Sequence, residues 1–313
     1  MARLVGALGR VLITAGALLL AFAAFQLWGT GLEESGHQDD LGSELSERLG
    51  VSDDSSVGDV AADLEQLAPA TAPSAAETPE GEAAGVIRIP RIGLEKIFVA
   101  GTSKPDLKKG PGHYLGTPTP GQAGNAAIAG HRTTYGAPFN RIDELVPGDR
   151  IETFTLQGKF VYQVVAPPDG PSIERGPGWW SVRPTQGEVI GPVEGEGNWL
   201  TLTACHPKYS AEQRIIVRAQ LVADTPPAPS AEAGERPTTP SNPGSELDTG
   251  LGGDPGALLP AILLGLAGGM VWLVAWLVAR RWKRWPAVLV GVPAFGVLLW
   301  FCFVFVDRWL PSV

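Results

Sequence analysis

Cys205, His131 and Arg214 are the side chains of this sequence whose types could support covalent catalysis. The chain has two cysteines, and the other one, Cys302, lies in an apolar run at 288–306, so Cys205 has no evident disulfide partner. A cysteine reacts as its thiolate, and we expect a neighbouring positive group to keep the sulfur charged. Cleavage of an amide also needs a general acid, for which histidine is suited, and a fixed donor for the oxyanion. These residue types therefore predict acyl transfer through a cysteine nucleophile.

The spacing of the three residues places each of them at the end of a strand-like run. Cys205 follows the run 198–204, and Arg214 opens the next run, RIIVRAQLV, nine residues later. If these two strands pair antiparallel, Arg214 comes close to Cys205 across the ladder, where its several donors suit an oxyanion. His131 follows the run NAAIAG at 125–130. A side chain at a strand end is held rigidly while it stays accessible.

Taken singly, each residue also has a simpler explanation. Cys205 could be a buried inert thiol, Arg214 a solvated strand residue and His131 a loop histidine with a local hydrogen bond. A zinc site is disfavoured, because adjacent Cys205 and His206 rarely supply two ligands to one metal and no C-x₂-C spacing exists. A papain-like enzyme usually places its cysteine before its histidine, which is the reverse of the order here. We expect neither a metal nor a cofactor; the candidate zinc ligands would have been His113, His131, Cys205 and His206.

The elements that position these residues are predicted to be β-strands within a block at 86–222. The runs are short, rich in β-branched residues and separated by turns, which is typical of a sandwich or a closed barrel. Residues 140–145 are the one plausible helical turn, and the long Gly- and Pro-rich stretch 167–197 is expected to be a substrate loop. Gln157-Gly158 suggests a tight hairpin. The expected strands are 86–92, 96–100, 125–130, 150–156, 159–166, 199–204 and 214–222.

An apolar run at 11–28 follows Arg3 and Arg10 and is about long enough to span a bilayer. A cleaved secretory signal is the alternative, since residues 21–23 have a small-x-small pattern. The apolar run continues past that point, which favours an uncleaved anchor. We therefore interpret residues 1–29 as a cytoplasmic N-terminus followed by a first transmembrane helix.

Two further transmembrane helices are predicted at 256–279 and 286–306. The loop 280–285 between them is strongly basic, with the sequence RRWKRW, and short basic loops tend to be cytoplasmic. This orientation places residues 30–255 outside the cytoplasm, together with the C-terminal tail 307–313. The expected location is thus the cell membrane, with several spans.

Two polar segments separate the block at 86–222 from these apolar runs. Residues 30–85 are predicted to be an acidic disordered linker, in which 57–67 could form a short amphipathic helix. Residues 223–255 are predicted to be a Pro-rich tether. The net charge of −9 disfavours nucleic-acid binding, which favours basic patches.

The order of the motifs closely resembles the sortases: a histidine after AIAG, a cysteine after TLTA and an arginine that begins RIIVRA. The segment AGHRTTYGAPFNRIDELVPGD at 129–149, taken with TLTACHP, looks most like the class E sortases of actinobacteria. The resemblance covers about residues 86–222. It implies an all-β fold with an eight-stranded β-barrel, short helical turns and a Cys–His–Arg site, to which this chain adds three transmembrane helices.

The resemblance also implies the reaction, a transpeptidation through a thioacyl-enzyme intermediate. Cys205 would be the nucleophile, His131 the acid and then the base, and Arg214 the group that positions the substrate and stabilises the oxyanion. The substrates would be secreted proteins with a C-terminal sorting signal, LAxTG-like rather than LPxTG, cut between Thr and Gly. The acceptor would be an amine of a peptidoglycan precursor or a pilin.

Substrate-binding residues are expected at Tyr114, with Tyr135 as the rival candidate, and at Thr203. A tyrosine hydroxyl could bond the backbone N–H that alanine has and proline lacks. The chain has Ala204 where the family often has threonine, so we expect the oxyanion to depend on Arg214 and on backbone N–H groups. The alternative to an enzyme is a membrane-tethered extracellular binding domain in which Cys205 is a buried structural residue.

Overall fold

A computed structural model of the chain describes residues 2–50, 56–67, 78–194, 197–222, 254–281 and 284–310. The chain divides into two compact units: Met1–Gln26 with Gly252–Ser312, and Leu27–Leu251 with Val313. The predicted Pro-rich tether lies almost wholly outside the described residues, as do two residues of the basic loop and the last three of the tail.

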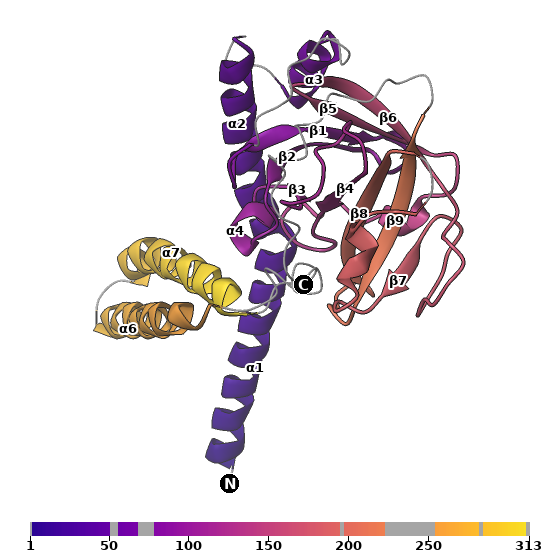
Figure 1. Cartoon of the computed structure of the whole chain (residues 1–313). Helices are drawn as coiled ribbons and strands as arrows, with labels where there is room; N and C mark the ends of the chain where they lie inside the picture. The colour runs from indigo at the N-terminus through magenta and orange to yellow at the C-terminus, as the bar shows by residue number, and fades with distance from the viewer. Residues whose placement is uncertain are drawn as a thin grey trace. The chain divides into compact units, whose positions relative to one another are not determined.

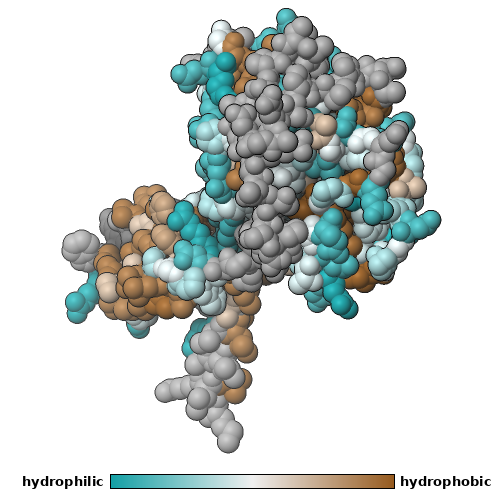
Figure 2. Space-filling view, viewed as in Figure 1, coloured by the Kyte–Doolittle hydropathy of each residue, from teal (hydrophilic) through white to brown (hydrophobic). Residues whose placement is uncertain are grey.

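The first unit consists of apolar helices. They are α1 (Ala2–Ala24), α6 (Leu258–Arg281) and α7 (Arg284–Trp309), with a 3₁₀ turn at Pro255–Ala257 before α6. Among the residues that the structure describes, three helical stretches are long and apolar enough to cross a membrane: Leu12–Leu49, Pro255–Arg281 and Val288–Trp309. Figure 2 shows the hydrophobic surface that α6 and α7 expose, to which Leu263, Trp272 and Val290 contribute. Side chains of this kind are stable in lipid and unfavourable in water.

The second unit is built on a closed β-barrel, as predicted (Figure 1). Eight strands follow one another around the barrel in the order β6-β5-β1-β2-β3-β4-β8-β9, and pairing of β6 with β9 closes it. A ninth strand, β7, pairs with β9 as well. The strands are β1 (Ala83–Ile89), β2 (Leu94–Ala100), β3 (Gly112–His113), β4 (Asn125–Ala129), β5 (Arg150–Thr155), β6 (Gly158–Val164), β7 (Trp180–Val182), β8 (Trp199–His206) and β9 (Gln213–Leu221).

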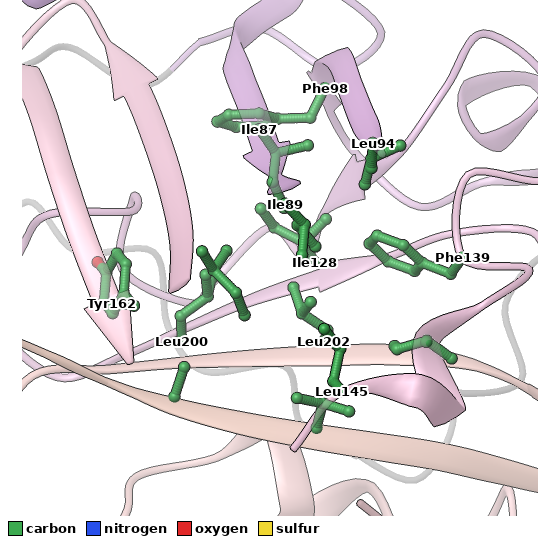
Figure 3. Close-up of a cluster of buried hydrophobic side chains, with 14 of the residues drawn as sticks. Ile87, Ile89, Leu94, Phe98, Ile128, Phe139, Leu145, Tyr162, Leu200 and Leu202 are labelled. Atoms are coloured by element: carbon green, nitrogen blue, oxygen red, sulfur yellow. The ribbon is translucent and has the colours of Figure 1, made fainter. Parts of the chain in front are cut away.

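The barrel encloses one large apolar cluster, part of which Figure 3 shows. Successive strand residues point to opposite faces, so every second residue of β8 enters this core. Leu200, Leu202 and Ala204 are buried in it. Thr203 and Cys205 therefore face the outside of the barrel wall, where Cys205 is partly exposed and Thr203 is covered by other side chains.

The predicted strands all occur, with ends shifted by a few residues. Residues 90–92 form a 3₁₀ turn, Pro90–Ile92, because proline lacks the N–H that a strand needs. The predicted helical turn is the 3₁₀ segment Ile142–Glu144. The stretch 167–197, expected to be a loop, contains the unpredicted strand β7 and a 3₁₀ turn, Gly187–Ile190.

The prediction of disorder for residues 30–85 is wrong over most of its length. A π-helical turn, Phe25–Gly29, is followed by α2 (Thr30–Leu49), and α3 (Val57–Glu65) has a capping box between Ser56 and Asp59. The acidic composition concealed an apolar stripe at helical spacing, which is buried against the barrel. Residues 51–55 and 68–77 lie outside the described residues. The apolar cluster contains Leu41, Leu45, Val60, Ala61 and Leu64 from the two helices, with Ala83, Val86, Ile97, Val99 and Phe154 from the strands.

Candidate active site

Cys205 and Arg214 are direct partners in the antiparallel ladder of β8 and β9. Side chains of directly opposed residues share one face of the sheet, so the guanidinium lies beside the sulfur. Cys205 is partly exposed, whereas Arg214 is buried. Arg214 Nη1 donates to the carbonyl oxygens of Ala211 (3.0 Å) and Gln213 (2.9 Å). The turn between the two strands thus fixes the guanidinium next to the thiol.

The pKa of the Cys205 thiol is raised above its ordinary value. Burial is the largest cause, because it disfavours the charged thiolate. The positive charges of Arg214 and Arg132 lower the pKa but do not outweigh the burial. We expected a positive group to keep the sulfur charged; in this structure the neutral thiol is favoured instead, so a base must take its proton before it attacks.

His131 lies just beyond the end of β4, which pairs in parallel with β8 and aligns Ala129 with Thr203. The Gly130 N–H donates to the carbonyl oxygen of Thr203 (3.0 Å) and extends this alignment past the strand end. His131 lies two residues beyond Ala129, and Cys205 lies two residues beyond Thr203, its aligned partner. The parallel register therefore brings the histidine and the cysteine to the same edge of the barrel, with His131 buried.

Arg132 is a further charged residue of this site, and sequence reasoning missed it. Its side chain is only 2 % exposed. Nη1 donates to the Cys205 carbonyl oxygen (3.3 Å) and to His206 Nδ1 (2.7 Å), and Nη2 pairs with Asp143 Oδ1 (2.9 Å). Since arginine only donates, His206 Nδ1 accepts, and its Nε2–H donates to Glu174 (3.1 Å). The signal in the sequence was an arginine directly after the histidine of AGHR.

Tyr114 and Thr203 lie together on the outer face of the barrel wall. The two hydroxyl oxygens are 2.9 Å apart, and both side chains are buried. Tyr114 also packs against Ala129 and Ile190. Thr203 precedes Cys205 by two residues and shares its face of β8. Tyr114 and Thr203 therefore lie along the strand that carries the cysteine.

Tyr135 belongs to the loop that follows His131, and the two rings are in contact. Their centroids are 5.1 Å apart with an interplanar angle of 37°. Lys108 Nζ lies over the Tyr135 ring, 4.7 Å from its centroid. Tyr135 thus lies beside His131, whereas Tyr114 lies beside β8, the strand that carries Cys205.

The remaining histidine of the barrel, His113, has a local structural role. Burial lowers its pKa to about 4, so the ring is neutral near pH 7. Nε2 lies 2.9 Å from the Pro118 carbonyl oxygen and 3.1 Å from Thr117 Oγ1. Within the described parts of the chain, no group of three or more His, Cys, Asp or Glu residues is arranged to hold a metal ion.

Ala204 does not border the thiol, because its side chain points into the barrel core. Consecutive strand residues face opposite ways, so Ala204 and Cys205 lie on different sides of the sheet. A threonine hydroxyl at position 204 would therefore enter the core. In contrast to our expectation from the sequence, a threonine side chain here would not point toward the sulfur.

Comparison with known proteins identifies relatives of the barrel unit. A family profile described as "Sortase domain" matches residues 87–222. Sortase SrtE1 of Streptomyces coelicolor is 31% identical over 235 residues, which are 70% of this chain and 58% of that protein. Sortase SrtE2 of the same organism is 29% identical over 238 residues, 71% of this chain and 83% of that protein. This chain thus spans less than two thirds of the length of SrtE1.

A solved structure of sortase E from Streptomyces avermitilis is also similar. It is 37% identical in sequence, and the match covers 46% of this chain and 91% of that one, with a TM-score of 0.39.

Proposed function

This chain belongs to the sortase family, in class E, and from that premise we propose that it is a cysteine transpeptidase of secreted proteins. One observation carries the proposal. Cys205 is paired across the ladder with the buried Arg214, and the β4–β8 register brings His131 to the same edge. A nucleophile, an acid–base group and a fixed donor together make up what acyl transfer requires.

In the acylation step, His131 accepts the thiol proton of Cys205 as the sulfur attacks the threonine carbonyl carbon of the sorting signal. The neutral thiol that burial favours makes this proton transfer necessary. Arg214 donates to the oxyanion that forms on the carbonyl oxygen. His131 then returns the proton to the glycine nitrogen as the C–N bond breaks, and the threonine remains on sulfur as a thioester.

In the transfer step, an acceptor amine attacks the thioester carbon while His131 takes the amine proton. The C–S bond breaks, the proton returns to the sulfur, and a new amide is released. We assign the acceptor to a peptidoglycan precursor or a pilin lysine, and the catalytic unit to the outer side of the cell membrane. The family supports this class of acceptor, and the apolar helices α6 and α7 support a membrane location. The basic residues of the loop 280–285 favour the outer side for the catalytic unit.

We propose that the sorting signal is LAxTG-like and that Tyr114 and Thr203 bind it. Their hydroxyl groups bond to each other, and a Tyr114 hydroxyl that donates to Thr203 keeps lone pairs that can accept the alanine N–H of the substrate. Proline has no such N–H, which gives this site a preference for alanine. Tyr135, which contacts His131, is the rival for this role.

The test is a cleavage assay of the full-length protein in detergent with paired LAxTG and LPxTG peptides and an excess of amine. We expect a new amide product, faster from LAxTG, and none with Cys205→Ala. Arg214→Ala should lower kcat/KM by about 10²–10³, and Arg214→Lys should restore little of it, since an ammonium cannot reproduce the planar fork. Turnover by Cys205→Ala would exclude Cys205 as the nucleophile, and the absence of product with the wild-type protein would favour the binding-domain alternative.

A further inference from the structure

We propose that Thr30 and Glu34, in the first turns of α2, are positioning residues that hold the loop 131–139 and thereby the ring of His131. This inference rests on the proposed role of His131 as acid and base. It gives a function to part of the segment 30–85, which the sequence had predicted to be a disordered linker.

The loop after His131 has a strained backbone conformation. Tyr135 and Ala137 have φ values of 50° and 45°, in the left-handed region that residues with a Cβ seldom adopt, and Gly136 between them has a φ of 70°. Such backbone persists only where the surroundings impose it, and it is concentrated at active sites. One bond within the loop, from the Ala137 N–H to the Thr134 carbonyl oxygen (2.9 Å), contributes to this conformation, and neighbouring elements supply further contacts.

The first turn of α2 supplies these contacts. The Tyr135 N–H donates to Thr30 Oγ1 at 3.0 Å, and Thr30 is 1 % exposed, so water does not replace this bond. Glu34 lies so close to Gly136 that a Cβ there would come within 2.5 Å of its Oε2. The helix and the loop thus fit each other at two successive residues of the strained segment.

The helix is itself anchored to the barrel, so it can act as a fixed support. Gln38 bonds to both backbone groups of Ile97, accepting from the N–H at 2.9 Å and donating to the carbonyl oxygen at 2.9 Å, and it also donates to the Lys109 carbonyl oxygen at 2.8 Å. Glu34 is paired with Lys96 at 2.9 Å and is 1 % exposed. Figure 1 shows α2 running beside β1 and β2.

The support reaches the active site through the ring of Tyr135. That ring is in contact with both the His131 ring and the Lys108 ammonium. The Phe139 N–H donates to the His131 carbonyl oxygen at 3.1 Å and closes the loop. If the Tyr135 backbone shifts, the surface against which the imidazole rests shifts with it, and proton transfer is sensitive to such small displacements.

The test compares Thr30→Val with wild type in the full-length protein. Valine keeps the shape of threonine but removes the acceptor for the Tyr135 N–H. We expect kcat/KM to fall by about tenfold to a hundredfold, mainly through kcat, because His131 and not peptide binding is affected. We also expect faster hydrogen exchange at the Tyr135 amide. Thr30→Ser restores the acceptor and should recover both values.

The matched control is Ser35→Ala on the same helix, whose exposed hydroxyl bonds only to the Gly31 carbonyl oxygen. It should resemble wild type. Glu34→Gln, which keeps the side-chain size and loses the charge paired with Lys96, is a second variant and should lower kcat in the same direction. The melting temperature of each variant is measured as well. A loss of kcat counts as support only where the melting temperature equals that of wild type.

Two results would overturn the inference while leaving the proposed function intact. One is a Thr30→Val protein with wild-type kcat and an unchanged Tyr135 amide; the other is an equal loss of kcat in Ser35→Ala. A wild-type protein without transpeptidation would instead refute the proposed function. The exchange rate of the Tyr135 amide would still report whether Thr30 holds the loop.

Discussion

Burial and charge act in opposite directions on the thiol of Cys205. Burial raises its pKa, and the guanidinium groups of Arg214 and Arg132 lower it. Arg214 reaches the sulfur across the ladder, and Arg132 donates to the carbonyl of the same residue. The two positive charges thus offset part of the effect of burial, although the pKa of the thiol stays above its ordinary value and a base is needed to take the proton.

Arg132→Met tests the electrostatic part of this account. The charge of Arg132 lowers the thiol pKa, so its removal should raise that pKa. The pH profile of Cys205 alkylation by iodoacetamide should therefore shift to higher pH than in wild type. Arg141→Met is the control, because Arg141 is exposed and paired with Glu144. An alkylation profile that does not move in Arg132→Met would show that its charge does not act on the sulfur.

The sequence was sufficient to predict the three proposed catalytic residues but not their neighbours. Cys205, His131 and Arg214 are of reactive types and stand at strand ends, and the expected antiparallel pairing of Cys205 with Arg214 is present. The parallel pairing of β4 with β8, which brings His131 to the same edge, was not predicted. Arg132 reads in the sequence as an ordinary charged loop residue, because only the folded chain shows that it is buried against Cys205 and Asp143.

At the level of elements, the alternation of apolar and polar residues predicted the long strands. The acidic composition of residues 30–85 led to a wrong prediction of disorder where the helices α2 and α3 form. Leu200 and Leu202 alternate with outward threonines, a pattern that holds without knowledge of the fold. The strands β3 and β7 contain two and three residues, too few for any periodicity to appear. In α2 the acidic residues dominate the average, although Leu41 and Leu45 form a buried stripe one turn apart.

Leu45→Ala tests whether α2 is part of the barrel unit. Leu45 is 1 % exposed in the cluster shared with α3 and the barrel, so its truncation should leave a cavity and lower the free energy of unfolding by about 2–5 kcal/mol. Leu32→Ala is the control on the same helix, where the side chain is 70 % exposed and little change is expected. Denaturant titration would measure both, and an equal effect of the two variants would mean that α2 does not dock.

For the whole molecule, the sequence predicted both the barrel and three apolar helices, and both are present. Barrel closure depends on β6 pairing with β9, a contact between distant segments that no local pattern encodes. The orientation of the spans stays a prediction. It depends on Arg3 and Arg10 and on the basic loop 280–285, which favour the cytoplasmic side.

Labelling of intact cells with a membrane-impermeant maleimide tests this orientation. In a Cys302→Ala background the reagent should label Cys205 without permeabilisation. A cysteine placed near the N-terminus by Ala2→Cys, in a protein that also carries Cys205→Ala, should be labelled only after permeabilisation. Labelling of Ala2→Cys in intact cells would reverse the predicted topology.

The most direct test of the central claim is the intact mass of the full-length protein after brief incubation with an LAxTG peptide and no added amine. We predict a mass increase equal to the peptide segment that ends in threonine, located on Cys205, lost on addition of an amine and absent in Cys205→Ala. His131→Ala should accumulate little of it. A protein that cleaves the peptide without this adduct, or that carries it in the absence of Cys205, would contradict the account.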